Sequence, residues 1–155
     1  MEVRTIATTK QGSLLTIRRR DVPVPESALG LMARSDAELV AAQLASEPEE
    51  QFLHAHLAAL RAGAALLQVT GRPARRPVPR TVWDMVAAVT PELGEWTAFF
   101  ADGAATRAAV ESGRTAVDPD RAERTLRAAE DFQDAVRSVL DPEGRAQDSF
   151  ALRAS

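Results

Sequence analysis

Cysteine and tyrosine are absent from this sequence, and aromatic residues make up only 5% of its 155 residues. Without cysteine the chain cannot form a disulfide, a thiolate zinc site or a cysteine nucleophile. A chain of this length buries roughly two-thirds of its unfolded surface, so a single domain needs neither a disulfide nor a metal to hold it together. We therefore expect no metal site and no cofactor.

Lysine is nearly absent as well: Lys10 is the only one, and arginine supplies the other 18 basic residues. The 22 acidic residues outnumber the 19 basic ones and give a net charge of −3, which argues against a generally polybasic nucleic-acid binder. No uninterrupted apolar run approaches the ~20 residues of a membrane span. Near the N-terminus a short apolar run precedes its basic cluster, the reverse of a secretory signal. A cytoplasmic protein is therefore expected.

The chain divides into three parts. Residues 1–24 hold Thr, Val and Ile residues around a turn signal at Gly12, which is typical of a weak β-hairpin or of a disordered extension. Residues 25–141 show helical periodicity and form the predicted domain, and residues 142–155 are the predicted flexible tail. Basic charge concentrates in residues 1–24 and 71–80, whereas the predicted helices are acidic.

Helical spacing predicts an all-α bundle of about five antiparallel helices joined by short connections. The expected helices cover residues 26–45, 46–70, 82–89, 91–102, 104–112 and 118–140, the fifth being short. In the first, an apolar stripe recurs at intervals of three and four residues: Leu29, Ala33, Ala37, Val40 and Leu44. Ser46 is expected to cap the second helix with Glu49 reaching back, Gly71 to end it, Thr81 to cap the third, and Asp118 with Pro119 to begin the last. Asp102-Gly103 is expected to end the fourth.

The two histidines, His54 and His56, lie on the second predicted helix. Positions two apart on a helix face nearly opposite sides, so the pair cannot bind one metal ion together. His56 shares a face with Phe52 and Leu60 and is expected to border the core, whereas His54 is expected to face solvent. Phosphate-binding glycine loops and the G-x-S-x-G nucleophile pattern are both missing from the sequence.

The most basic segment is 71–80, which reads GRPARRPVPR and contains Arg72, Arg75, Arg76 and Arg80. Guanidinium groups pair well with phosphates and carboxylates, so these four are candidates for contacting RNA or an acidic partner. The alternative is a solvated loop paired with acidic helices. This alternative is favoured because no aromatic residues lie between the arginines to stack on bases.

Four aromatic residues cluster within eighteen positions: Trp83, Trp96, Phe99 and Phe100. In an alanine-rich protein they are expected mainly to fill the core, because aromatic side chains bury large areas. The alternative is a partly exposed patch through which two chains dimerise.

The segments HLAALRAGAALL (54–67), TVWDMVAAVTPELGEWTAFFADGAATRAAVESG (81–113) and DPDRAERTLRAAEDFQDAVRSVL (118–140) resemble a family of small actinobacterial proteins of the HEPN superfamily. The most specific part is W-x-x-x-A-x-V-x-P-E-L-x-E-W-x-x-F-F, and the resemblance covers about residues 25–141. It implies a four- or five-helix bundle that often dimerises, and in many members a metal-independent ribonuclease.

Those ribonucleases carry an arginine followed four to six residues later by a histidine, late in the chain. Here no histidine follows His56, and no arginine lies at that spacing before either histidine. The resemblance therefore supplies no catalytic residue. We expect a non-catalytic HEPN-like protein that binds protein, as a homodimer or with another partner. The alternative is an RNA-binding module or divergent ribonuclease of a toxin or defence system that uses the arginine-rich loop.

Overall fold

The structure is a computed structural model that describes residues 23–73 and 81–143. Five α-helices and one short 3₁₀ helix form within these residues, and none of them lies in a strand, so the predicted all-α fold is confirmed. The elements are α2 (Glu26–Leu44), α3 (Pro48–Thr70), α4 (Val82–Val89), η1 (Pro91–Leu93), α5 (Gly94–Glu111) and α6 (Pro119–Leu140). The hairpin or extension predicted at the N-terminus falls outside the described residues, as does most of the predicted tail.

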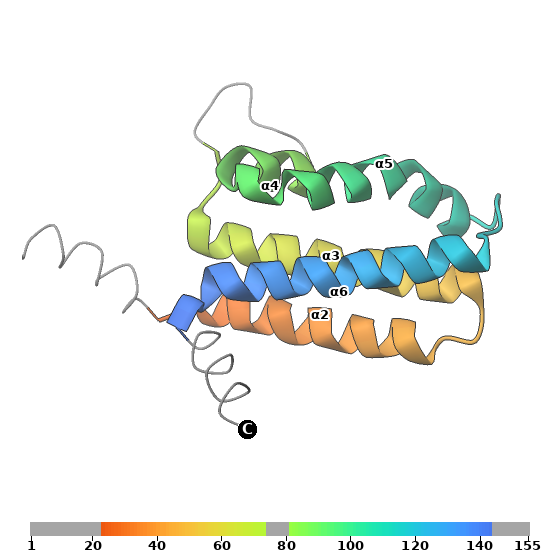
Figure 1. Cartoon of the computed structure of the whole chain (residues 1–155), viewed down its shortest axis with the longest axis horizontal. Helices are drawn as coiled ribbons and strands as arrows, with labels where there is room; N and C mark the ends of the chain where they lie inside the picture. The colour runs from red at the N-terminus through yellow and green to blue at the C-terminus, as the bar shows by residue number, and fades with distance from the viewer. Residues whose placement is uncertain (1–22, 74–80, 144–155) are drawn as a thin grey trace, which may run out of the picture. The chain divides into compact units, whose positions relative to one another are not determined.

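Helix α3 is the central element, since it packs against α2, α4, α5 and α6 (Figure 1). Small side chains make this possible, because alanines let neighbouring backbones approach closely on several faces. Its buried residues are Phe52, Ala55, His56, Ala58, Ala59, Ala62, Gly63, Ala65, Leu66 and Leu67. By length and hydropathy α3 alone, among the described residues, resembles a membrane span, but 56% of that stretch is buried, as in the core helix of a bundle.

Several helix ends lie where the sequence places them. The Thr81 hydroxyl accepts a hydrogen bond from the Asp84 backbone N–H at 3.0 Å, which caps α4. Gly71 has φ = 78°, a left-handed conformation that favours glycine, and its N–H donates to the last turn of α3. Asp118 accepts from the Asp120 N–H at 3.1 Å at the start of α6. These three end signals are confirmed.

Two end signals are wrong. Ser46 does not cap α3, whose N-cap is Glu47; the Glu49 carboxylate instead accepts from the Val117 backbone N–H at 3.1 Å and ties this end of α3 to the segment before α6. The helix predicted to end at Asp102-Gly103 continues unbroken to Glu111. Gly103 lies inside α5 because its missing side chain leaves room for a neighbouring ring, described below.

A polar connection joins α2 to α3 and α6. The Ser35 hydroxyl is fully buried and donates to the Ala58 carbonyl at 2.7 Å. The Gln133 side-chain amide donates to the Ser35 oxygen at 3.1 Å and to the Asp36 carboxylate at 2.9 Å. Arg137 also pairs with Asp36. These bonds fix which face of α2 turns toward the bundle, since buried polar groups must be satisfied.

Aromatic side chains fill the space between α3, α4, α5 and α6. Trp83 stacks on Phe100 with ring centroids 5.0 Å apart, and Phe132 meets both rings edge-on or tilted. The imidazole of His56 lies between Phe52 and Phe100, with centroid distances of 4.7 and 5.3 Å. The expectation that this cluster mainly fills the core agrees with the near-complete burial of Trp83 and Phe100.

Candidate functional site

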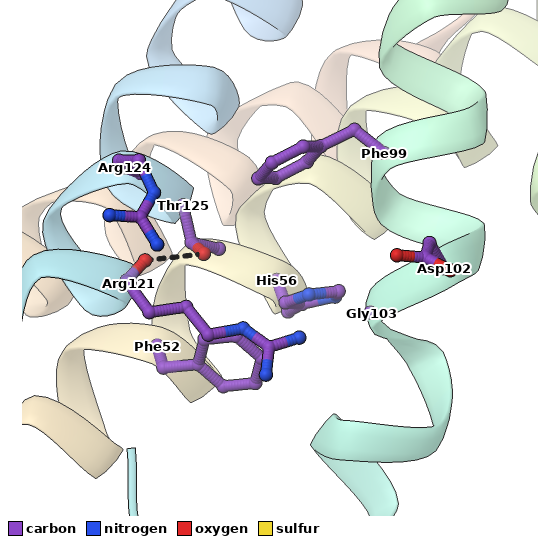
Figure 2. A pocket seen from close by; sticks show the side chains of 8 residues that line it. All are labelled: Phe52, His56, Phe99, Asp102, Gly103, Arg121, Arg124 and Thr125. Carbon is purple, nitrogen blue, oxygen red and sulfur yellow. Dashed lines mark hydrogen bonds between the residues drawn. The ribbon is translucent and has the colours of Figure 1, made fainter. Parts of the chain in front are cut away.

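A pocket of about 160 Å³ opens between α3, α5 and α6 (Figure 2). Its volume far exceeds the roughly 10–15 Å³ that a single water molecule requires. Each of the three helices contributes part of its lining: Phe52 and His56 from α3, Phe99, Asp102 and Gly103 from α5, and Arg121, Arg124 and Thr125 from α6. Charged, aromatic and hydroxyl groups from distant parts of the sequence thus meet in one hollow.

His56 lies deepest among the titratable groups of this pocket, with only 2% of its surface exposed. Its approach to α5 depends on Gly103: a Cβ atom built there would lie 2.6 Å from Nε2 and 2.9 Å from Cε1 of the imidazole. Within the described residues, neither ring nitrogen has a hydrogen-bond partner. His56 is therefore a largely buried side chain that lines the pocket and forms no hydrogen bond within the described residues.

Burial, together with the positive charges of Arg107 and Arg121, lowers the pKa of His56 from 6.5 to about 4, and burial is the largest cause. Desolvation disfavours the charged imidazolium, and nearby guanidinium groups repel it. The ring is consequently neutral at pH 7 and a poor proton acceptor. His54 differs, because it is half-exposed and its Nδ1 lies 2.6 Å from the Glu38 carboxylate. The expected burial of His56 is confirmed, while His54 adds a carboxylate partner.

The arginines of the pocket have no carboxylate partner in the part of the chain that the structure describes. Arg121 donates from Nη2 to the Thr106 hydroxyl at 3.1 Å, and its guanidinium carbon lies 5.5 Å from the centroid of the Phe52 ring. Among the described residues, Arg121 and Arg124 form no ion pair, even though Asp102 lines the same pocket. The Thr125 hydroxyl donates to the Arg121 carbonyl at 2.8 Å and holds this turn of α6 in place (Figure 2). The lining thus has an excess of positive charge.

The aromatic residues proposed as a dimer patch separate into two groups. Trp83 and Phe100 are buried in the core, whereas Trp96 is half-buried and Phe99 is 41% exposed. Phe99 also lines the pocket, with its ring at right angles to that of Phe100. Only Trp96 and Phe99 therefore offer atoms to a partner, and a dimer contact through them stays a prediction.

The arginine-rich loop is described only at its start. Arg72 is exposed, while Arg75, Arg76 and Arg80 lie outside the described residues. The described part of the chain contains no group of three or more His, Asp or Glu side chains arranged to hold a metal ion. The loop's role in binding RNA or an acidic partner stays a prediction.

Helix α2 presents an apolar surface that no described segment covers. Its buried face consists of Ala28, Met32, Ser35, Leu39 and Ala42. The stripe that stands out in the sequence lies on the other side, where Leu29, Val40 and Leu44 are 55%, 52% and 80% exposed and Ala33 and Ala37 are exposed between them. We refer to Leu29, Ala33, Ala37, Val40 and Leu44 as the α2 stripe.

The fold defines an alanine-rich helical bundle built around α3, with a histidine and two arginines meeting in one pocket. The family model of the SAV_6107-like HEPN domain matches residues 42–137, well over half of the sequence. The chain belongs to this HEPN family, so the resemblance drawn from the sequence is confirmed. Neither the curated proteins nor the solved structures searched for comparison contain a match.

Sequence reasoning did not find the pocket. It assigned Arg121 and Arg124 only to a helix without histidine, and treated His56 as a residue bordering the core. One signal was available: Gly103 lies within an otherwise helical pattern, and a glycine inside a helix often marks a close approach of another group. The partner in that approach, forty-seven positions earlier, could not be read from the sequence.

Proposed function

We propose that the chain is a non-catalytic HEPN-like binding protein that pairs with a second copy of itself through the α2 stripe. The exposure of this stripe carries the proposal. Exposed apolar side chains are ordinary when scattered, but a continuous row of them along one helix is typical of an interaction surface. The side chains of the stripe carry no charge, which suits the centre of an interface.

A second copy fits this stripe because the row is self-complementary when reversed. A two-fold axis requires each residue to meet its counterpart in the opposite order. With the axis between positions 36 and 37, Leu29 faces Leu44 of the other copy, Ala33 faces Val40, and Ala37 faces Asp36 beside the stripe. The two leucine pairs close the ends, and the alanines near the middle let the helices approach within the usual ~8–10 Å.

The dimer should be weak. The stripe runs fifteen helical steps from Leu29 to Leu44, about 22 Å, so one helix pair covers less than the roughly 1,200 Å² typical of a stable complex. We therefore expect a micromolar or weaker dissociation constant and a rapid exchange between monomer and dimer. Trp96 and Phe99 lie on α5 and are not needed for this pairing.

The test compares two exposed alanines that receive the same substitution. Ala37→Glu places a charge at the centre of the stripe, and Ala98→Glu places one on the exposed side of α5. Sedimentation over roughly 1–1000 µM brackets the expected affinity. Ala37→Glu should abolish the dimer and Ala98→Glu should leave it unchanged. A monomer across the whole range for the unmodified chain, or equal effects of both variants, would contradict the proposal.

Two observations support the absence of catalysis. The only histidines are His54, which is paired with Glu38, and His56, whose pKa burial lowers to about 4. A general base works best when its pKa lies near the operating pH, and the pKa of His56 lies well below neutrality.

RNA binding through Arg72, Arg75, Arg76 and Arg80 is the second candidate. Phosphate contacts predict affinity that falls steeply as salt rises. Undetectable RNA binding at low salt, or binding that survives replacement of all four arginines by alanine, would exclude it.

A further inference from the structure

The pocket between α3, α5 and α6 combines features that point to a small anionic ligand. It brings two guanidinium groups, Arg121 and Arg124, to one hollow without an ion-pair partner among the described residues. It also contains His56, a side chain that is 98% buried and has no hydrogen bond in the described part of the chain. The imidazole therefore has hydrogen-bonding capacity that is available to a ligand entering this hollow.

We propose that this pocket binds a small tetrahedral oxyanion, held by the guanidinium groups of Arg121 and Arg124, and that His56 takes up a proton from solvent as the anion enters. This proposal is independent of the dimer described above. It differs from a solvated arginine surface because the site is concave, has a buried titratable floor and is bounded by the Phe52 and Phe99 rings.

The donors available to an oxyanion can be counted from the structure. The Arg121 guanidinium has five N–H donors. Within the described residues only its Nη2 has a hydrogen-bond acceptor, the Thr106 hydroxyl. The Thr106 bond and the Phe52 ring hold that side chain in place, so its remaining donors are preorganised. Arg124 is exposed and has no acceptor within the described residues, so its guanidinium is free to turn toward a ligand.

The charges facing His56 explain the coupling to protons. From α5 it faces Asp102 and Arg107, and from α6 it faces Arg121 and Arg124. Without a ligand, burial and positive charge keep the imidazole neutral. A dianion offsets the guanidinium charges and accepts a hydrogen bond from the imidazolium, which favours the protonated ring. Binding should therefore strengthen as the pH falls.

Sulfate is the best probe, because it remains a dianion over the relevant pH range and any proton uptake must come from the protein. With only two histidines in the chain, both imidazoles can be followed by NMR. Sulfate should raise the pKa of His56 from about 4 toward its ordinary 6.5 and leave His54 unaffected. The affinity for sulfate should then rise by up to about ten-fold for each unit by which the pH falls between 6.5 and about 4.

Matched variants on α6 test the arginines. Arg124→Gln removes an exposed pocket side chain and should weaken sulfate binding by about ten-fold or more, as expected for a lost charge-assisted hydrogen bond. Arg127→Gln removes an exposed arginine that pairs with Glu123 and does not line the pocket, so it should change the affinity less than about two-fold. Both positions are exposed, so neither change should impair folding.

Chloride at equal ionic strength separates binding from general screening, and acetate separates a tetrahedral from a planar oxyanion. The proposal is supported if sulfate and inorganic phosphate shift His56 while chloride and acetate do not. It is overturned if His56 does not respond to sulfate, if His54 and His56 respond equally, if acetate matches sulfate, or if Arg124→Gln behaves like Arg127→Gln.

Discussion

Replacing Gly103 with alanine tests the packing that places His56 in the pocket. The new Cβ would lie 2.6 Å from Nε2 of the imidazole, closer than non-bonded heavy atoms tolerate. Phe52 and Phe100 flank the ring with centroids at 4.7 and 5.3 Å, so the open space beside it is the pocket that it lines. Either α5 must shift away from α3 or the ring must leave its position.

Two opposing effects set the magnitude. Overpacking a well-filled interior costs about 1–3 kcal/mol. Alanine in a helix interior is favoured over glycine by about 1 kcal/mol, which offsets part of that cost. We expect Gly103→Ala to lower the free energy of unfolding by about 1 kcal/mol. In a His56→Ala background the clash disappears, so the same substitution should raise it by about 1 kcal/mol.

Urea denaturation followed by far-UV circular dichroism measures both differences, provided that the slope of the transition is unchanged. Gly30→Ala is the matched control, because a Cβ at this helical glycine of α2 meets nothing within 4 Å. It should be neutral or stabilising in both backgrounds. The reasoning is refuted if Gly103→Ala stabilises the unmodified chain as Gly30→Ala does, since the ring would then not require the glycine.

Two further changes follow from buried groups. Because burial lowers the pKa of His56 from 6.5 to about 4, the unfolded chain binds a proton at this residue more readily than the folded chain does. In chloride buffer, protonation of His56 should therefore lower the free energy of unfolding by up to about 3 kcal/mol as the pH falls from 6.5 to about 4. His56→Gln should abolish this part of the pH-dependent shift in the urea midpoint. Ser35→Ala should cost about 1–3 kcal/mol in the same assay, because it leaves the buried amide of Gln133 short of an acceptor, whereas Ser27→Ala, which removes an exposed bond to Gln68, should cost less than about 0.5 kcal/mol.

The sequence identified elements whose signals are local. Thr81, Gly71 and Asp118 mark helix ends because the groups they satisfy lie within a few residues. The predicted Ser46 cap is wrong because a capping pattern describes only nearby groups. The Glu49 carboxylate instead accepts a hydrogen bond from the Val117 backbone N–H, which is distant in sequence. Local chemistry therefore located most helices but not the contacts between them.

The orientation of α2 shows where hydrophobic periodicity stops being informative. Leucine, valine and alanine form one apolar row, while Ala28, Met32, Leu39 and Ala42 form another, because alanine is abundant on every face. The structure buries the second row, which includes Ser35, and leaves the first exposed. Ser35 is acceptable inside because Ala58 and Gln133 satisfy it, and both partners are distant in sequence. Periodicity alone ranks the two faces in the opposite order.

The pocket could not be predicted from the sequence because its residues come from three different helices. A search for an arginine and a histidine at a fixed spacing assumes that both lie on one helix, whereas here His56 comes from α3 and Arg121 and Arg124 come from α6. What joins them is a glycine on a third helix, which interrupts no secondary structure and allows the imidazole to lie against α5. When tertiary packing assembles a site from several helices, the local sequence shows only the small residue that permits the close approach, and here that residue is Gly103.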